Sequence, residues 1–298
     1  MPDLATAGAE ATLAAALRHA AAALRAEGVD EPAADARRLA AAVLGMSAAQ
    51  MLAHPEHVLS PEQASRLSRL LARRARREPV SRILGEREFY GRVFSISPAT
   101  LDPRPDSETL VGAALALLRA EGPPARPLRI LDVGTGSGCL LLSLLAELPD
   151  ATGVGTDVSA AALCVARENA SRLGLASRAS WLLADMLEGV DGPFDLLVSN
   201  PPYVATAEIA MLEPEVRSFD PLAALDGGQD GLRAFHRLAP GCGEIVPDGW
   251  IVLEVGYEQA DAVAALLGAA LGRAGASRTR IFSDLGGRRR CVAMRSRN

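Results

Sequence analysis

The sequence predicts an α/β protein, a mostly parallel β-sheet covered by helices on both faces and preceded by a small all-helical region. Two observations support this prediction. Over residues 10–78, apolar side chains recur at helical spacing and no strand-like alternation interrupts them. From residue 107 onward, short apolar runs alternate with helical segments, a pattern typical of parallel sheets whose crossover connections are helices.

The first region carries helix start and stop signals. Apolar residues from Leu13 to Leu24 recur at helical spacing, and Gly28 ends this helix. A second helix is expected from Pro32 to about Gly45. A third start is predicted by Ser60-Pro61-Glu62-Gln63, because a capping serine, a first-turn proline and a glutamine three residues after the serine make a capping box.

The third helix ends in a run of arginines, Arg73-Arg74-Ala75-Arg76-Arg77. One interpretation is a basic docking patch. The other is a solvated helix end, whose positive charges complement the negative end of the helix dipole. The second interpretation is the more ordinary one for such a run.

A change of pattern near Gly85 indicates a linker between two domains. Residues 86–90 and 92–96 flank Gly91, as in a short hairpin, and prolines between 98 and 105 keep the following chain extended. We therefore expect a helical domain over residues 1–84, a β-hairpin linker over 85–106 and an α/β domain over 107–298.

The α/β domain is expected to alternate strands with helices. Strands are expected near residues 128–133, 152–157, 179–184, 194–199 and 249–255. Helices are expected near residues 107–120, 138–148, 159–173, 229–239 and 257–272. Two late strands, near 278–283 and 289–295, bracket Gly286-Gly287 and would form an antiparallel edge hairpin.

The first of these strands leads into Gly134-Thr135-Gly136-Ser137-Gly138 and then into a helix. Glycines let the backbone approach a ligand closely, because no Cβ intervenes. This spacing is one residue tighter than the G-x-G-x-x-G loop that binds a dinucleotide pyrophosphate. A ligand without pyrophosphate fits the loop better, and S-adenosylmethionine is the common one.

Residues at the ends of the next two strands extend this candidate cofactor site. Asp157 ends the second strand, where a carboxylate can accept hydrogen bonds from both ribose hydroxyls; the alternative is a cap for the helix near Ser159. Asp185-Met186 follows the third strand, where a side chain could contact an adenine. An ordinary turn explains Asp185 nearly as well.

The fourth strand ends in Asn200-Pro201-Pro202-Tyr203. Prolines have no N–H to donate, so the carbonyl groups of this turn remain available as acceptors. Asn200 adds an amide oxygen, and Tyr203 adds a flat aromatic face. Such a turn suits the N–H groups of a planar amide or aromatic amine. In a doubly wound sheet it lies beside the glycine loop, so the two motifs predict one site for chemistry on nitrogen.

Four further motifs accompany these two. They are Arg77-Glu78-Pro79-Val80, Gly85-Glu86-Arg87-Glu88-Phe89-Tyr90-Gly91, Pro103-Arg104-Pro105-Asp106-Ser107-Glu108 and Asp226-Gly227-Gly228-Gln229-Asp230-Gly231-Leu232. The combination, over roughly residues 10–295, resembles the HemK/PrmC family, the glutamine-N5 methyltransferases that modify peptide chain release factors.

The resemblance implies a class I S-adenosylmethionine-dependent methyltransferase fold with a seven-stranded sheet. It implies that the glutamine of a Gly-Gly-Gln motif in class I release factors is the methyl acceptor and that the helical domain helps to bind the release factor. Implied S-adenosylmethionine-binding residues are Gly134, Thr135, Gly136, Ser137, Gly138, Asp157, Asp185, Met186 and Asn200. Implied substrate-binding residues are Asn200, Pro201, Pro202 and Tyr203, of which Asn200, Pro201 and Tyr203 are the expected catalytic ones.

Three positions depart from the family pattern. Asp102 precedes Pro103 where the family usually has an aliphatic residue, and Arg82 replaces a common tyrosine. Met186 stands where an aromatic residue is frequent, so its contact with adenine would be looser.

Other functions fit less of the sequence. Asn-Pro-Pro-Tyr also occurs in DNA adenine-N6 methyltransferases, where the ring stacks on a flipped base, but a basic DNA groove is not visible. A closer alternative is the enzyme that methylates a glutamine of ribosomal protein L3, although residues 105–108 and 219–228 look more like the release-factor branch. A nucleotide-binding adaptor would be expected to lose Asp157 or Asn200, and an NAD-linked oxidoreductase would need the longer glycine loop.

Composition adds several expectations. The net charge of −5 argues against a nucleic-acid binder held by bulk electrostatics. The 4 cysteines and 4 histidines show no metal-ligand spacing, so isolated thiols and no metal are expected. The first four residues lack the order of a signal peptide, and no apolar run approaches the roughly 20 residues that span a bilayer. We expect a monomeric, cytoplasmic protein.

Overall fold

The computed structural model describes residues 12–122, 124–272 and 279–297. The signal-peptide prediction concerns residues outside these ranges. The chain forms two compact units: unit 1 holds the residues up to Gly85 together with Glu213–Phe219, and unit 2 holds Glu86–Leu212 and the residues from Asp220 onward. A short segment from the middle of the α/β region therefore belongs to the helical unit.

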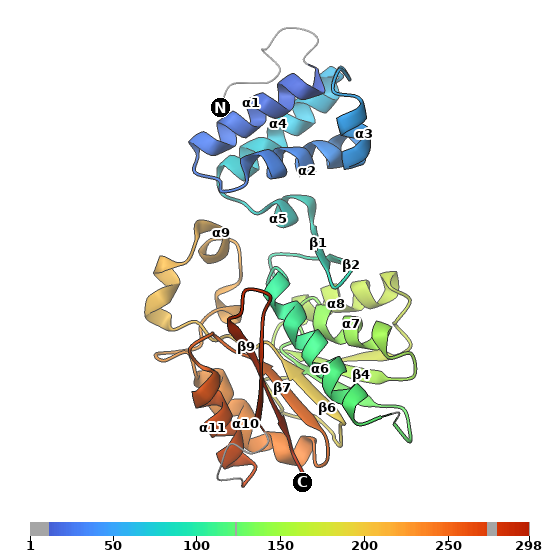
Figure 1. Ribbon diagram of the computed structural model, residues 1–298, viewed down its shortest axis with the longest axis vertical. Helices are drawn as coiled ribbons and strands as arrows, with labels where there is room; N and C mark the ends of the chain where they lie inside the picture. The colour runs from blue at the N-terminus through green and yellow to red at the C-terminus, as the bar shows by residue number, and fades with distance from the viewer. Residues whose placement is uncertain (1–11, 123, 273–278, 298) are drawn as a thin grey trace. The chain divides into compact units, whose positions relative to one another are not determined.

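Unit 1 is all-helical, as the apolar periodicity predicts (Figure 1). Gly45 ends the second helix in the left-handed conformation, with φ of 65°. The predicted capping box is confirmed, because Ser60 Oγ accepts from the Gln63 N–H while Gln63 Oε1 accepts from the Ser60 N–H. The helices are α1 (Leu13–Ala26), α2 (Pro32–Leu44), α3 (Ala48–Ala53), α4 (Pro61–Ala75), α5 (Val80–Leu84) and α9 (Pro214–Arg217).

The core of unit 1 lies between α1, α2 and α4, which pack against one another. Leu24, Leu39 and Leu67 come from these three helices, and each is fully buried. Burying one leucine contributes about 1.5–3 kcal/mol, so this shared apolar seam is what holds the three helices together.

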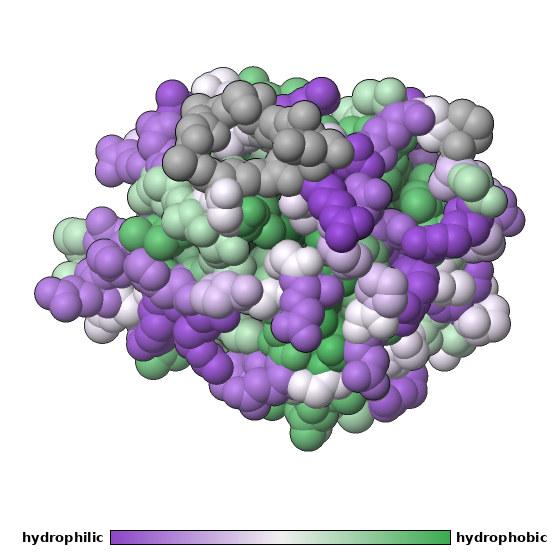
Figure 2. All heavy atoms as spheres, turned by 90° about the horizontal axis from the view of Figure 1, so that it is seen from below, coloured by the Kyte–Doolittle hydropathy of each residue, from purple (hydrophilic) through white to green (hydrophobic). Residues whose placement is uncertain are grey.

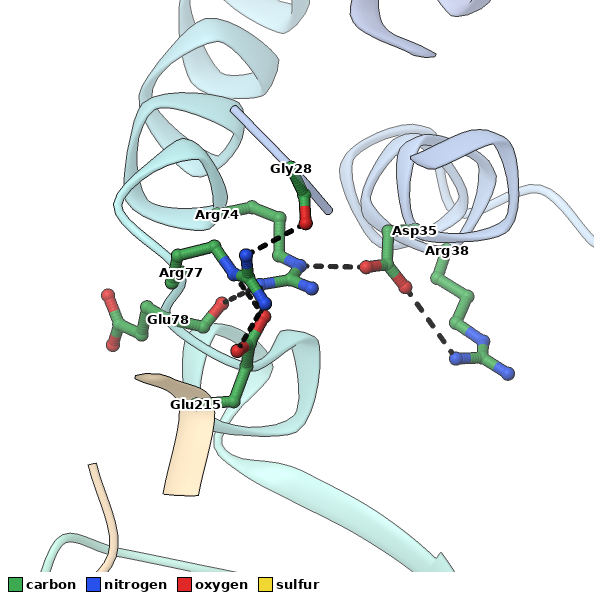
Figure 3. Close-up of polar contacts among 7 residues, drawn as sticks. All are labelled: Gly28, Asp35, Arg38, Arg74, Arg77, Glu78 and Glu215. Carbon is green, nitrogen blue, oxygen red and sulfur yellow. Dashed lines mark hydrogen bonds and ion pairs between the residues drawn. The ribbon is translucent and has the colours of Figure 1, made fainter. Parts of the chain in front are cut away.

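Within the arginine run at the end of α4, Arg74 is buried in ion pairs, so the interpretation of the run as a solvated helix end was wrong for this residue, whereas Arg76 is exposed. Arg74 is 6% exposed; its Nε donates to Asp35 Oδ2 over 2.7 Å and its Nη1 to Glu215 Oε1 over 2.9 Å (Figure 3). Arg77 donates to both oxygens of Glu215. Local pattern could not reveal these pairs, because both carboxylates lie far from α4 in the sequence.

Unit 2 contains the predicted hairpin and a seven-stranded sheet. The hairpin strands β1 (Glu86–Phe89) and β2 (Arg92–Ser95) pair antiparallel. In the large sheet the strand order is β5-β4-β3-β6-β7-β9-β8, parallel from β5 to β7, and β9 runs antiparallel to both neighbours. Its strands are β3 (Arg129–Val133), β4 (Thr152–Asp157), β5 (Ala179–Leu183), β6 (Leu196–Ser199), β7 (Trp250–Glu254), β8 (Thr279–Ser283) and β9 (Arg289–Arg295).

Helices cover both faces of this sheet (Figure 1). Neighbouring residues of one strand point to opposite faces, so Val252 packs with the apolar side chains of α6 (Glu108–Ala120) and α7 (Cys139–Glu147), while Ile251 packs with those of α10 (Arg233–Ile245) and α11 (Ala260–Ala270). Helix α8 (Ala160–Arg172) lies against β4 and β5. The predicted doubly wound α/β architecture is confirmed.

One helix differs from its predicted position. The sequence predicts a helix near 229–239, whereas α10 spans Arg233–Ile245. Residues 226–232 instead form turns in which Asp226 Oδ1 accepts from the Gly228 N–H and Asp230 Oδ1 accepts from the Leu232 N–H, each over 3.0 Å. The aspartates satisfy the backbone locally, and this competes with helix formation.

The chain reverses its direction of strand addition at β3. From β3 it proceeds outward through β4 to β5, then returns to add β6 and β7 on the other side. The carboxyl ends of β3 and β6 therefore open a crevice at a topological switch point, the usual ligand site of such sheets. The glycine loop follows β3, and the Asn200–Tyr203 turn follows β6.

The surface seen from below Figure 1 mixes hydrophilic and hydrophobic residues (Figure 2). A mixed surface of this kind is ordinary for a globular domain. Across the described ranges, no helix combines the length and the apolar character required to cross a membrane.

Candidate active site

The glycine loop turns through three left-handed residues. Gly134, Gly136 and Gly138 have φ values of 72°, 55° and 79°, a region that residues with a Cβ rarely occupy. Thr135 anchors the loop to the neighbouring strand, because its N–H donates to the Thr156 carbonyl over 2.8 Å. Helix α7 begins directly after Gly138, so its first backbone N–H groups face the loop.

Asp132 is hydrogen-bonded to the glycine loop through Thr135. Its side chain is fully buried at the end of β3, and Oδ2 accepts a hydrogen bond of 2.6 Å from Thr135 Oγ1. Burial raises the pKa of Asp132 to about 7, although the hydrogen bond from Thr135 opposes this shift. The sequence analysis did not single out this carboxyl group.

Asp157, at the end of β4, is bonded to the same loop. Its Oδ2 accepts from the Gly136 N–H and its Oδ1 from the Ser159 N–H, each over 2.9 Å. The cap of α8 is Ser159 itself, whose Oγ accepts from the Ala162 N–H. Asp157 thus orients both the glycine loop and the entrance to α8.

Asp185 and Met186 follow β5. Asp185 forms an ion pair of 2.8 Å with Arg237, and both side chains are more than 40% exposed. Met186 has φ of 56°, an uncommon conformation for a residue with a Cβ, and its carbonyl accepts a 3.4 Å hydrogen bond from Thr156 Oγ1.

The Asn200–Tyr203 turn is held at both ends. Asn200 Nδ2 donates to Ser107 Oγ over 3.2 Å, and the Tyr203 hydroxyl donates to Glu254 Oε1 over 3.1 Å. The Tyr203 carbonyl accepts from Gln259 Nε2 over 3.0 Å. The hydrogen bond from Asn200 uses its nitrogen, so Asn200 Oδ1, at the cavity wall, remains an acceptor for a ligand.

These motifs surround one cavity of about 530 Å³, a typical size for a small-molecule site. Of the residues predicted from the sequence, those lining it are Gly134, Thr135, Gly136, Ser137, Asp157, Asp185, Met186, Asn200 and Pro202. Gly138, Pro201 and Tyr203 do not line it: Pro201 is buried, Tyr203 points to Glu254, and Gly138 lies against Leu142 and Trp181.

The cavity also has walls that sequence reasoning missed. Ala99–Leu101, Pro103, Arg104 and Ser107 line it from the segment before α6, and Arg233 and Arg237 line it from α10. Ser107 belongs to a motif quoted for the family resemblance, and Glu254 ends β7 at the same sheet edge as Asn200. The motif around Ser107 and the position of Glu254 at the end of a parallel strand were the available signals, although Glu254 itself does not line the cavity.

Two family models match the chain. The PrmC N-terminal domain matches residues 15–85, and the methyltransferase small domain matches residues 111–213. The catalytic domain of hMettl16, solved in complex with MAT2A 3′UTR hairpin 6, superposes with a TM-score of 0.56 at 18% identity, covering 77% of this chain and 82% of that chain. This likeness concerns the fold alone and confirms the expected class I methyltransferase architecture.

Curated relatives resemble the chain over nearly its whole length. The release factor glutamine methyltransferase of Rhodospirillum rubrum is 48% identical over 275 residues, which cover 92% of this chain and 82% of that protein. The protein of the same name from Cereibacter sphaeroides is 46% identical over 281 residues, covering 94% and 97%. With both family models matched as well, the chain belongs to the release factor glutamine methyltransferase family.

Proposed function

We propose that this methyltransferase transfers a methyl group from S-adenosylmethionine to the N5 nitrogen of the glutamine in the Gly-Gly-Gln motif of class I release factors, in the cytoplasm. One observation carries the proposal. The Asn200 amide is held by its nitrogen, so its oxygen remains an acceptor at the wall of the glycine-loop cavity, and the carbonyl of the next residue, the buried Pro201, is the proposed second acceptor. Two acceptors match the two N–H bonds of a primary carboxamide.

The chain's own residues fit S-adenosylmethionine. A Cβ added at Gly134 or Gly136 would meet no atom within 4 Å, so the backbone there faces open space that a ligand can fill. Asp157 is an acceptor at the cavity wall, suited to ribose hydroxyls. When bound, the sulfonium group supplies the methyl group that the reaction transfers.

Asn200 and Pro201 orient the acceptor nitrogen. A carboxamide nitrogen is a poor nucleophile, because its lone pair is delocalised into the carbonyl group. Accepting both N–H bonds fixes the amide plane and stabilises the positive charge that grows on nitrogen during transfer. Positioning of this kind is worth up to about 7–11 kcal/mol in well-oriented intramolecular reactions. Tyr203 would place its ring beside the amide plane.

The helical unit is the proposed docking domain for the release factor. Its matched family model covers residues 15–85, separately from the model that covers the methyltransferase motifs. We propose the domain boundaries given above, with residues 1–84 as this substrate-binding domain.

The test is methyl incorporation from labelled S-adenosylmethionine into purified class I release factor, compared with the same factor carrying Gly-Gly-Ala. Ribosomal protein L3 and duplex DNA serve as competing substrates. Label that requires the glutamine supports the proposal. Label in L3 or DNA, with none in the release factor, overturns the substrate assignment and leaves the methyltransferase chemistry intact.

A further inference from the structure

A fully buried asparagine on α8 is bonded to two segments that lie far from it in the sequence. Asn169 is 0% exposed. Its Oδ1 accepts from the Ser95 N–H over 2.7 Å, and its Nδ2 donates to the Ser95 carbonyl over 2.9 Å. The same Nδ2 donates to the Ser137 carbonyl, also over 2.9 Å. One side-chain amide therefore joins β2 of the hairpin to the glycine loop.

The partners of Asn169 determine the orientation of its amide. A carboxamide group has two N–H donors on its nitrogen and one acceptor oxygen. Here both donors meet backbone carbonyls, and the oxygen meets a backbone N–H. Turning the amide over would place Oδ1 against two carbonyl oxygens and Nδ2 against an N–H, so all three hydrogen bonds would be lost. The Asn169 side chain is thus held in a single orientation.

The contact with Asn169 fixes one peptide unit of the glycine loop. The carbonyl of this unit belongs to Ser137 and accepts from Asn169, whereas its N–H belongs to Gly138 and donates to the Thr135 carbonyl over 2.8 Å. Because a peptide unit is planar, bonds at both of its polar groups fix its orientation. Ser137 lines the cavity and the buried Asn169 does not, so the Ser137 carbonyl is directed out of the cavity.

Asn169 complements Asp157, which holds the preceding residue of the loop. Asp157 accepts from the Gly136 N–H over 2.9 Å, and Asn169 donates to the carbonyl of the next residue, Ser137. A donor and an acceptor of neighbouring loop residues are therefore satisfied by two different side chains. The first of these side chains lies at the cavity wall, and the second connects the loop to the hairpin.

The hairpin follows directly on the helical unit in the chain. The first part of unit 1 ends at Gly85, and β1 begins at the next residue. Ser95, the last residue of β2, is bonded to α8 through Asn169, and Arg172 of the same helix donates to Ser95 Oγ. Ser95 does not line the cavity. A displacement of the end of β2 therefore reaches the glycine loop through the Asn169 side chain.

We propose that Asn169 is a positioning residue for S-adenosylmethionine: it holds the Ser137 carbonyl out of the cavity and couples the glycine loop to the hairpin. This inference rests on the proposed binding of S-adenosylmethionine at the glycine loop. Coupling between two sites is reciprocal, so binding of the cofactor also stabilises the contact between Asn169 and Ser95. A purely structural contact would contribute to the stability of the fold and leave the affinity for the cofactor unchanged.

The first test compares Asn169→Ala with Arg178→Ala. Arg178 is a matched control, because its Nη1 also donates to two backbone carbonyls, those of Leu148 and Ala151, beside the first residues of β4 and β5. By calorimetry, the Kd for S-adenosylmethionine should rise about tenfold in Asn169→Ala, because the Ser137 carbonyl loses its buried partner. The same Kd should be unchanged in Arg178→Ala.

A second variant separates the two partners of Asn169. Asn169→Asp keeps an acceptor for the Ser95 N–H but places a carboxylate oxygen against the Ser137 carbonyl. Its Kd for S-adenosylmethionine should rise at least as much as that of Asn169→Ala. In the free protein, hydrogen exchange at the Gly138 N–H should accelerate about tenfold more than exchange at the β7 amides, and Arg178→Ala should show no such difference.

The wild type alone provides a third measurement, which decides even if the Asn169 variants do not fold. S-adenosylmethionine should slow hydrogen exchange at the Ser95 N–H by more than it slows exchange at the amides of α11, because Ser95 is bonded to Asn169. General stabilisation by a bound ligand would slow globally exchanging amides alike. Protection confined to Ser95 and its neighbours in β2 therefore supports the coupling.

The inference is overturned if Asn169→Ala binds S-adenosylmethionine with the wild-type Kd, or if the cofactor slows exchange at Ser95 no more than in α11. The proposed function fails differently, through a wild-type enzyme that does not bind S-adenosylmethionine or does not label the release factor. Exchange at the Gly138 N–H in the free protein needs neither ligand, so it still shows whether Asn169 holds the loop.

Discussion

The Glu215 carboxylate accepts two hydrogen bonds from the Arg77 guanidinium, from Nε to Oε1 over 2.6 Å and from Nη2 to Oε2 over 2.8 Å. Arg74 adds a third hydrogen bond to Oε1 at 2.9 Å (Figure 3). Burial alone would raise the pKa of Glu215, but the hydrogen bonds from the two arginines outweigh it and lower the pKa. This carboxylate fastens α9, a segment from far along the chain, to the helices of unit 1.

We expect Glu215→Ala to destabilise unit 1 by about 3 kcal/mol, because it leaves shielded guanidinium groups without their partner. Hydrogen exchange of backbone amides measures the loss of stability, in α4 for Glu215→Ala and in α11 for the control variant. Asp261→Ala is the control: Asp261 pairs with Arg289 at a site where its own side chain is 79% exposed, and such pairs contribute at most about 1 kcal/mol. Equal, small losses in the two variants would contradict the prediction.

Much of this architecture is predictable from local pattern. The capping box at Ser60, the alternation of strands and helices and the edge hairpin depend on residues close together in the sequence, and each is confirmed. The sequence also predicted that the glycine loop and the Asn200 turn belong to one site. Each follows a parallel strand, and the carboxyl ends of adjacent parallel strands share one edge.

The remaining features arise from contacts between distant residues. Arg74 bonds to Asp35 and Glu215, so its burial has no local signal. Glu254 ends an apolar strand, and nothing near it in the sequence marks its bond to Tyr203. The predicted start of a helix near residue 229 was wrong. Aspartate side chains there accept hydrogen bonds from backbone N–H groups, and this local bonding competes with helix formation.

Asp132 should make stability depend on pH. Its pKa is raised from 3.8 to about 7 by burial, so the folded protein retains a proton that the unfolded chain releases. The free energy of unfolding should therefore fall as pH rises from about 4 to about 7 and stay constant above, by about 4 kcal/mol for this group. The difference between the wild type and Asp132→Asn, from urea unfolding at several pH values, isolates it. A pH-independent difference would disprove the assignment.

Gly138 should tolerate alanine less well than another left-handed glycine. A Cβ at Gly138 would lie 3.1 Å from Leu142 and from Trp181, whereas a Cβ at Gly174 would meet nothing within 4 Å. Both positions have positive φ, so both variants incur the left-handed cost of about 1–2 kcal/mol. Gly138→Ala should lose about 1–3 kcal/mol more through overpacking and should weaken S-adenosylmethionine binding. Denaturant unfolding and calorimetry compare the two, and equal losses would refute the packing argument.

Asn200→Ala should lower the turnover of the release factor by about 10²-fold or more, because it removes a preorganised acceptor for the amide N–H. Gln229→Ala is the control for amide loss nearby: Gln229 is exposed in the turn before α10 and lies in a Gly-Gly-Gln sequence of this chain. Its loss should leave turnover unchanged, and no label should be found on Gln229 in the wild-type enzyme. Single-turnover rates with saturating S-adenosylmethionine distinguish a slower methyl transfer from weaker binding. A near-normal rate in Asn200→Ala would overturn the assignment of Asn200 as the residue that orients the substrate amide.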